Sequence, residues 1–132
     1  MSLVPVIARL RSDVLDWVEE VRDSSEADSG RFKYNRHMLR YYAVESTGHI
    51  AKLLWELDAV EDSPHTPHMI RFLQEQQDPE TGLFKDPLIS REDHVGGEGS
   101  HSWEHIWQHH TGVATLALEA LVVLEHPRPV EL

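Results

Sequence analysis

The 132-residue sequence contains no cysteine. This absence excludes disulfides, iron–sulfur clusters and thiolate zinc sites, and it is typical of proteins from a reducing compartment. The sequence also lacks an apolar run long enough to cross a membrane, and its first residues lack the pattern of a secretory signal. We therefore expect a cytoplasmic protein without a membrane partner.

Basic residues are scarce too, since 12 Lys and Arg stand against 23 Asp and Glu and give a formal net charge of −11. Such a charge repels phosphate backbones, so nucleic acid is not an expected partner. A length of 132 residues with 40% hydrophobic content is enough for one packed core. We expect a single domain over residues 1–132.

No stretch alternates polar and apolar residues for long enough to predict a β-strand. Apolar residues instead recur at three- and four-residue spacing, which predicts helices. The predicted helices cover about residues 3–23, 36–58, 66–77 and 102–125. Thr66 followed by Pro67 predicts an N-cap with proline in the first turn of the third helix. The expected fold class is all-α, built as two antiparallel helical hairpins.

The two predicted hairpins are similar in sequence. WVEEVRDSSEADSGRF (17–32) has the layout of FLQEQQDPETGLF (72–84): an aromatic and an aliphatic residue, a polar loop, then Gly-x-Phe. Likewise STGHIAKLLWEL (46–57) aligns with HTGVATLALEAL (110–121). Two-helix repeats bury their apolar faces by stacking on neighbours, so side-by-side hairpins are predicted. The repeats would cover about residues 3–60 and 64–125. The alternative is that any two amphipathic hairpins align this well.

The second copy is similar to a known repeat. Phe72-Leu73, three residues, Gln77, four residues and Gly82-Leu83-Phe84 resemble the QW-type repeat of terpenoid cyclases and prenyltransferase-like α/α toroids, with Phe84 in place of the usual Trp. The resemblance implies part of an α/α toroid, in which the second helix of each hairpin lines the interior. Complete toroids contain more than two hairpins. Self-association, or further repeats of a longer chain, is therefore expected, and Val14, Trp17, Leu116 and Leu121 should not all be covered internally.

The physical role of the repeated turn can be predicted from its residues. Gly82 can adopt the left-handed conformation that ends a helix, and Gly30 in the first copy should behave alike. Gln77 can bond the exposed carbonyl groups there, and Phe84 can pack back over the loop.

The resemblance also implies that a ligand would bind at the N-terminal ends of the second helices. Residues at these ends are Tyr41, Tyr42 and Glu45 in one hairpin, and Trp103, Glu104 and Trp107 in the other. Aromatic faces stack on sugar rings or isoprenoid chains, and carboxylates perform acid–base chemistry on glycosidic bonds. The alternative is that these residues form a wall that packs one helix against the next.

The first functional hypothesis is a noncatalytic repeat domain that stabilises or dimerises a larger toroid and contributes to a carbohydrate or isoprenoid cleft. The second is a carbohydrate-active hydrolase or lyase in which Glu45 or Glu104 is the acid–base residue. Either could act in a longer protein, of which this chain would be a part.

A third hypothesis is a histidine-rich metal site. His101, His105 and His109 follow one another at four-residue spacing, which aligns them on one helix face and suits zinc. Asp93, His94 or Glu98 could supply a further ligand. HSWEH at 101–105 also matches the H-x-x-E-H pattern of some metalloproteases, although few residues follow that could hold the distal ligand. Surface or packing histidines near an acidic loop are the alternative.

Overall fold

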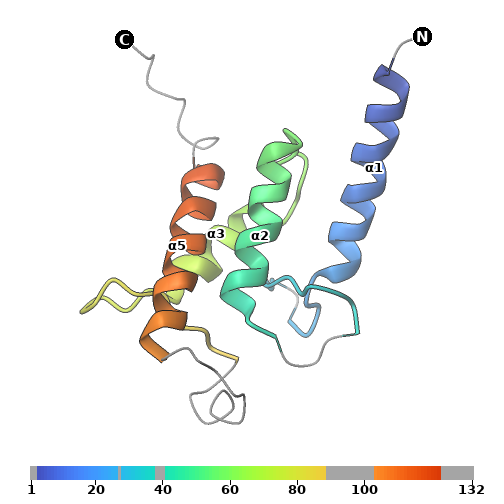
Figure 1. Cartoon of the computed structure of the whole chain (residues 1–132). Coiled ribbons are helices and arrows are strands. Elements are labelled where there is room, and N and C mark those ends of the chain that lie inside the picture. The colour runs from blue at the N-terminus through green and yellow to red at the C-terminus, as the bar shows by residue number, and fades with distance from the viewer. Residues whose placement is uncertain (1–2, 27, 38–40, 89–102, 123–132) are drawn as a thin grey trace, which may run out of the picture.

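The computed structural model describes residues 3–26, 28–37, 41–88 and 103–122, and gives only the backbone of 103–105 and 122. Within these ranges it contains helices and two isolated bridges but no β-strand, so the predicted all-α class is confirmed. The helices are α1 (Val4–Val21), α2 (Ala43–Glu56), α3 (Thr66–Glu75) and α5 (Trp103–Val122), shown in Figure 1. None of these helices is long and apolar enough to cross a membrane.

Helix α2 begins later than predicted, because the residues before it follow local turn chemistry. The helix was predicted from about residue 36, but Tyr42 is extended, with φ −79° and ψ 95°. The Asn35 side chain accepts the amide of His37 at 2.9 Å, and such local hydrogen bonds compete with helix formation. The Val44 amide in the first turn donates to the Asp86 carboxylate at 2.9 Å. A residue distant in sequence therefore caps α2.

The start of α3 also corrects the sequence prediction. Thr66 is the first helical residue and His65 holds the N-cap position. The Thr66 hydroxyl donates to the Val60 carbonyl oxygen at 2.7 Å, so it holds the preceding loop instead of capping the helix. Pro67 lies in the first turn, as predicted.

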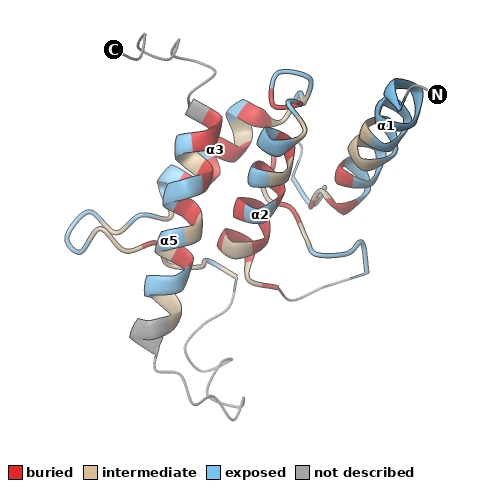
Figure 2. Cartoon of the chain, turned by 45° about the horizontal axis from the view of Figure 1, so that its top comes forward, coloured by how far each residue is buried: buried red, intermediate tan, exposed pale blue. Residues whose placement is uncertain are grey.

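The core lies where α2, α3 and α5 meet. Helices α2 and α5 lie side by side, and α3 packs against both (Figure 1). Figure 2 shows buried residues gathered on the facing sides of these helices. The core includes Val44, Ile50 and Leu54 from α2, Met69, Phe72 and Leu73 from α3, and Ala114, Ala117 and Leu121 from α5. Burial of these apolar side chains is the main driving force for folding.

Helix α1 contributes much less to this core. Only Val18 and Val21 of α1 are buried, and its N-terminal half stands away from the other helices (Figures 1 and 2). The middle of α1 is tied to the loop after α2 by the Arg11 side chain. Its guanidinium donates to the carbonyl oxygens of Leu57 at 3.2 Å and Asp58 at 3.0 Å.

The two hairpins share one turn geometry. The end of the first helix pairs with the phenylalanine of the Gly-x-Phe segment, Arg22 with Phe32 and Gln77 with Phe84. Two backbone hydrogen bonds of between 2.7 and 3.0 Å flank the bridge in each copy. The similarity seen in the sequence therefore corresponds to the same local fold.

The same phenylalanine also joins each turn to the second helix. The Phe32 amide donates to Thr47 Oγ1 at 2.9 Å, and the Phe84 amide donates to Thr111 Oγ1 at 2.8 Å. Thr47 and Thr111 are the residues that the sequence repeat aligns. Both phenylalanine rings are buried. We call this pair of contacts, the amide bond and the buried ring, the Phe–Thr latch.

The glycines of the two turns serve different purposes. Gly82 has φ +78°, so its predicted left-handed conformation is confirmed. It does not end α3, however, because the helix ends at Glu75 and Gly82 lies in the loop beyond it. The Gln77 side chain donates across this loop to the Gly82 carbonyl oxygen at 3.1 Å. The prediction that Gly30 behaves alike is wrong, because its φ lies outside the left-handed region. A Cβ on Gly30 would lie 2.1 Å from the His68 carbonyl oxygen. Gly30 is needed because α3 passes close to its backbone.

The latch predicts matched effects on stability. Thr47→Val and Thr111→Val keep the side-chain shape but leave a phenylalanine amide without its acceptor. Each should lower the free energy of unfolding by about 1–3 kcal/mol. The Thr47 change should cost more because its bond is fully buried, whereas that of Thr111 is partly buried. Urea denaturation measures both, and a neutral effect at Thr47 would contradict the latch.

The glycines predict a contrast between two alanine variants. Gly30→Ala should destabilise by about 2 kcal/mol or more, because the new methyl group overlaps the α3 backbone. Gly82→Ala should cost about 1 kcal/mol through backbone strain alone. Gly82→Asn is the control, since asparagine tolerates a positive φ and should cost less than alanine. Equal losses for both alanine variants would argue against this distinction.

Candidate functional site

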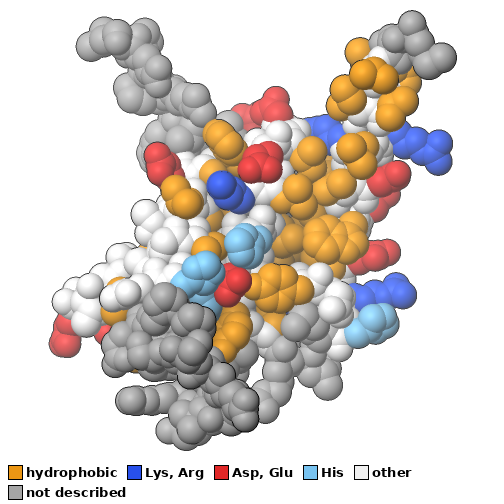
Figure 3. Space-filling model, viewed as in Figure 1, with side chains coloured by type: hydrophobic (Ala, Val, Ile, Leu, Met, Phe, Trp, Pro, Cys, Tyr) orange, Lys and Arg blue, Asp and Glu red, His pale blue; other side chains and the backbone are white. Residues whose placement is uncertain are grey.

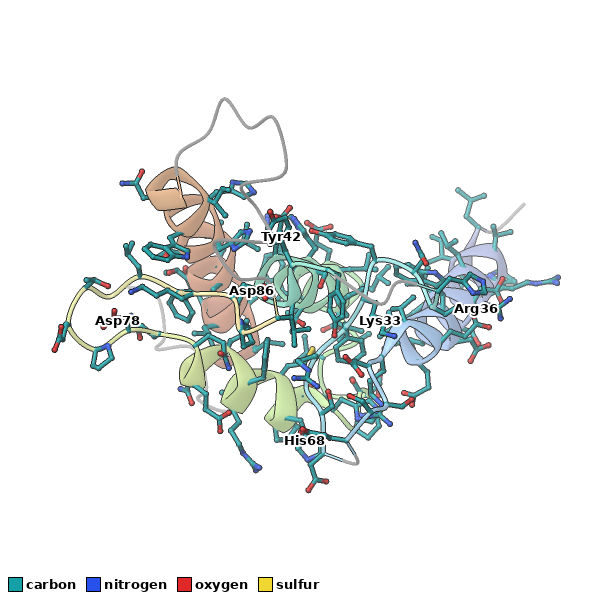
Figure 4. All side chains as sticks on the ribbon, turned by 90° about the horizontal axis from the view of Figure 1, so that it is seen from below. Lys33, Arg36, Tyr42, His68, Asp78 and Asp86 are labelled. Carbon is teal, nitrogen blue, oxygen red and sulfur yellow. The ribbon has the colours of Figure 1, made fainter. Side chains whose placement is uncertain are left out.

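The candidate site lies at the N-terminal ends of α2 and α5, which the fold places side by side. The helices approach closely where Gly48 of α2 meets Val113 of α5, and a Cβ on Gly48 would lie 2.5 Å from Val113 Cγ1. Figure 4 shows Tyr42, which precedes α2, near Asp86 of the second turn. Residues from both hairpins therefore meet at this end.

Glu45 is the centre of the site, because three histidines approach its carboxylate. His110 Nε2 lies 3.2 Å from Glu45 Oε2, His109 Nε2 lies 3.7 Å from Oε1, and His49 Nε2 lies 3.6 Å from Oε1. His110 is buried, whereas the side chains of His109 and His49 are 56% and 52% exposed. A ligand could therefore reach two of the three rings. Figure 3 shows histidine side chains gathered beside an acidic one over α2 and α5.

These contacts keep Glu45 ionised. The hydrogen bond with His110 lowers the pKa of the carboxyl group most, and the hydrogen bond from Tyr34 and the electrostatic effect of the nearby His109 lower it further. Together these effects exceed the opposing effect of burial, so the pKa of Glu45 falls to about 2. Burial and the negative charge of Glu45 raise the pKa of Tyr34. At neutral pH the site thus contains a carboxylate that accepts hydrogen bonds and a phenol that keeps its proton.

Tyr42 adds an aromatic face beside this carboxylate. Its ring packs edge-on against His110, with ring centroids 5.0 Å apart. Burial raises the pKa of Tyr42, and the charges of Asp86 and Glu45 raise it further. Asp86 also caps α2, so the same residue shapes both the helix start and the electrostatic potential of the site.

Other residues named from the sequence lie in different surroundings. Tyr41 is buried, and its hydroxyl donates to Asp23 Oδ2 at 2.5 Å, so it belongs to the packing and not to an open ligand surface. Trp107 is half-buried, with Lys85 Nζ 4.5 Å from its ring centroid. The side chains of Trp103, Glu104 and His105, and the whole of His101, lie outside the described residues.

The zinc hypothesis stays a prediction, because only part of its ligand set is described. His109 turns towards Glu45, and the part of the chain that the structure describes contains no group of three residues placed to hold a metal ion. The three imidazoles that surround Glu45 contact two different oxygens of its carboxylate. They are arranged around the carboxylate and not around a shared open position, which a metal site would need.

Sequence reasoning missed Tyr34, His49 and Asp86, and it gave no separate role to His110. The repeat alignment contained a usable signal, since extending it by one residue matches Glu45 with His109. Matched positions on neighbouring helices of a repeat tend to lie close together. Tyr34 and Asp86 gave no such signal, because they lie in the loops that precede the second helices.

Comparison with protein-family models, curated proteins and solved structures gives no significant match for this chain. The relation to α/α-toroid repeats therefore stays a prediction based on the residues quoted above. Function has to be inferred from the geometry around Glu45.

The pKa of Glu45 predicts how stability depends on pH. A carboxyl group whose pKa falls from 4.5 to about 2 on folding stabilises the folded state above pH 4.5, and this contribution is lost as the pH falls towards 2. Glu45→Gln removes it, so the variant should be less stable by about 1–2 kcal/mol at pH 6, after allowance for solvent screening. The difference from wild type in urea denaturation should shrink below pH 4.5. A difference that stays constant down to the acid limit would refute this ionisation.

Proposed function

We propose that the chain is a two-hairpin unit of the α/α-toroid type that binds a neutral carbohydrate at the end of α2 and α5 that carries Glu45. The convergence of Glu45 with exposed histidines from both second helices is the main support for this proposal. Because the ligand contacts come from both hairpins, the Phe–Thr latches that position those helices are part of the binding function.

The chemistry of the site favours a carbohydrate over an isoprenoid. An ionised carboxylate accepts hydrogen bonds from ligand hydroxyl groups, and the imidazoles of His49 and His109 can donate or accept them. The Tyr42 ring supplies an aromatic face of the kind that packs on a sugar ring. An isoprenoid chain would leave the carboxylate desolvated without a partner, which costs free energy. The negative potential from Glu45 and Asp86 further favours a neutral sugar over an acidic one.

Acid–base catalysis on a carbohydrate is the second candidate, and the pairing of Glu45 with exposed histidines favours it. A carboxylate beside an imidazole stabilises the charged ring that forms when the histidine takes a proton. In this chemistry Glu45 orients a histidine base and does not act as the acid, because its own pKa is about 2. The role of Glu104 stays a prediction.

Binding can be tested by NMR with isotope-labelled histidine side chains. Glucose, galactose or xylose at millimolar concentration should shift the ring resonances of His49 and His109. Glu45→Gln should abolish these shifts, whereas Glu119→Gln, which changes an exposed acid elsewhere on α5, should keep them. Shifts produced by geraniol but by none of the sugars would reject the carbohydrate class. No shift with any of these probes would reject Glu45 as a ligand site.

A further inference from the structure

Helix α1 carries an uncovered apolar stripe. Its N-cap residue and four residues of its first two turns are more than half exposed, namely Leu3 65%, Val4 70%, Val6 63%, Ile7 59% and Leu10 58%. Trp17 in the following turns is 40% exposed. Figure 3 shows hydrophobic side chains along α1 and in the space between α1 and α2. Exposed apolar surface of this extent is typical of an interaction site.

The spacing of the stripe identifies the kind of partner. The residues Leu3, Ile7, Leu10, Val14 and Trp17 are separated by four, three, four and three positions. Val14 is partly buried against the core, whereas the other four are exposed. An average spacing of 3.5 residues is typical of the apolar seam of a coiled coil, in which one helix packs along another. The partner is therefore expected to be a helix with an apolar stripe of its own.

The stripe includes a part of α1 that has no equivalent in the second hairpin. The repeat matches Trp17 with Phe72, so the start of α3 at Thr66 corresponds to Arg11. Residues 4–10 therefore extend α1 by about two turns beyond the repeat. Phe72 is 8% exposed within the hairpin pair, whereas its equivalent Trp17 is 40% exposed. The extension and Trp17 lie on a surface that the internal packing leaves open.

The side of α5 around Gly112, at the other end of the hairpin pair from α1, does not require a helical neighbour. Gly48 on α2 lies against Val113, but its repeat equivalent Gly112 has open space around it. The neighbours of Gly112 on the same side of α5 include Gln108, Thr115 and Glu119, which are polar and exposed, and Leu116, which is apolar and 53% exposed. A head-to-tail contact would place the apolar α1 stripe against a side of α5 on which three of these four side chains are polar, so it would bury less apolar surface on that side. A contact between two α1 stripes buries apolar surface on both sides.

We propose that a second copy of this chain covers the stripe, with the two α1 helices packed antiparallel about a two-fold axis near residue 12. This arrangement places Ile7 of one copy beside Trp17 of the other, and Leu10 beside Val14. The contact is isologous and closed, so it yields a dimer and not a filament. It involves α1 alone and does not depend on the proposed ligand site.

Charge supports the antiparallel direction. The first half of α1 carries Arg9 and Arg11, whereas the second half carries Asp13, Asp16, Glu19 and Glu20. In a parallel pair the acidic halves would lie together, which is unfavourable in a chain with a net charge of −11. In the antiparallel pair, Arg9 of one copy faces the segment with Asp13 and Asp16 of the other. Opposite charges beside a coiled-coil seam select the orientation of its helices.

Sedimentation equilibrium of the wild type and two variants tests whether the α1 stripe forms the dimer interface. Wild type should be a dimer, and Leu10→Lys should weaken association by about tenfold or more, because it places a charge in the apolar seam. Leu116→Lys is the matched control, since Leu116 is 53% exposed but lies on α5. It should leave association unchanged. A wild-type monomer at high concentration, or a Leu116→Lys variant that loses the dimer as Leu10→Lys does, would overturn the proposal.

Because the chain has no native cysteine, disulfide cross-linking can test whether the two α1 helices pack antiparallel. Chains with Ile7→Cys and with Trp17→Cys are mixed and oxidised, and the products are separated without reductant. The antiparallel pair should give the mixed disulfide between the two chains, because a disulfide needs Cα atoms within about 7 Å. Homodimers of the Ile7→Cys chain as the main product would indicate a parallel pair and overturn the antiparallel arrangement. Both chains must show the wild-type circular dichroism spectrum.

Discussion

The structure depends on a single contact that occurs twice, the hydrogen bond from a phenylalanine amide to a threonine hydroxyl. Phe32 and Thr47 make it in the first hairpin, and Phe84 and Thr111 make it in the second. A buried amide without an acceptor costs free energy, so the hydroxyl determines where the loop meets the helix. The adjacent ring fills the core, which couples the position of the turn to hydrophobic packing.

The latches position both second helices in the same way, and the candidate site is a consequence of that alignment. Close approach at Gly48 brings α5 next to α2, so His109 and His110 reach Glu45 across the helix boundary. The site therefore belongs to the hairpin pair, since neither hairpin alone contains both the carboxylate and these imidazoles. Asp86 reinforces the arrangement, because it lies in the second hairpin and caps the helix of the first.

The two flanks of the hairpin pair differ in chemistry. The α1 flank is apolar and extends beyond the core, while the α5 flank carries Gln108, Gly112 and Thr115. A head-to-tail contact would therefore bury less apolar surface than a contact between two α1 stripes. The apolar residues of α1 at three- and four-residue spacing therefore have two roles. Those near its C-terminal end pack into the core, and those near its N-terminal end form the surface that would contact a partner.

Sequence periodicity alone determined the all-α class and the approximate extents of α1, α3 and α5, because apolar residues at three- and four-residue spacing share one face only in a helix. The left-handed turn at Gly82 was also predictable, since few other residues tolerate a positive φ. The late start of α2 was not predicted, because apolar periodicity does not register the Asn35 turn before it, and because Asp86, which caps its first turn, is more than forty residues away. The role of Gly30 was missed for the same reason, since only the fold brings the α3 backbone against it.

For the candidate site, too, the sequence predicted some features and only the fold determined the others. The sequence pointed to Glu45 and His109, because an acid, histidines and aromatic residues are concentrated near the starts of two helices. It could not show that Tyr41 turns into the core, or that His49, His110 and Tyr34 approach Glu45. Periodicity specifies which face of a helix is buried, but the partners of a polar side chain depend on how helices from separate hairpins are brought together. Residue types were therefore readable from the sequence, whereas their ionisation and their contacts were decided by tertiary packing.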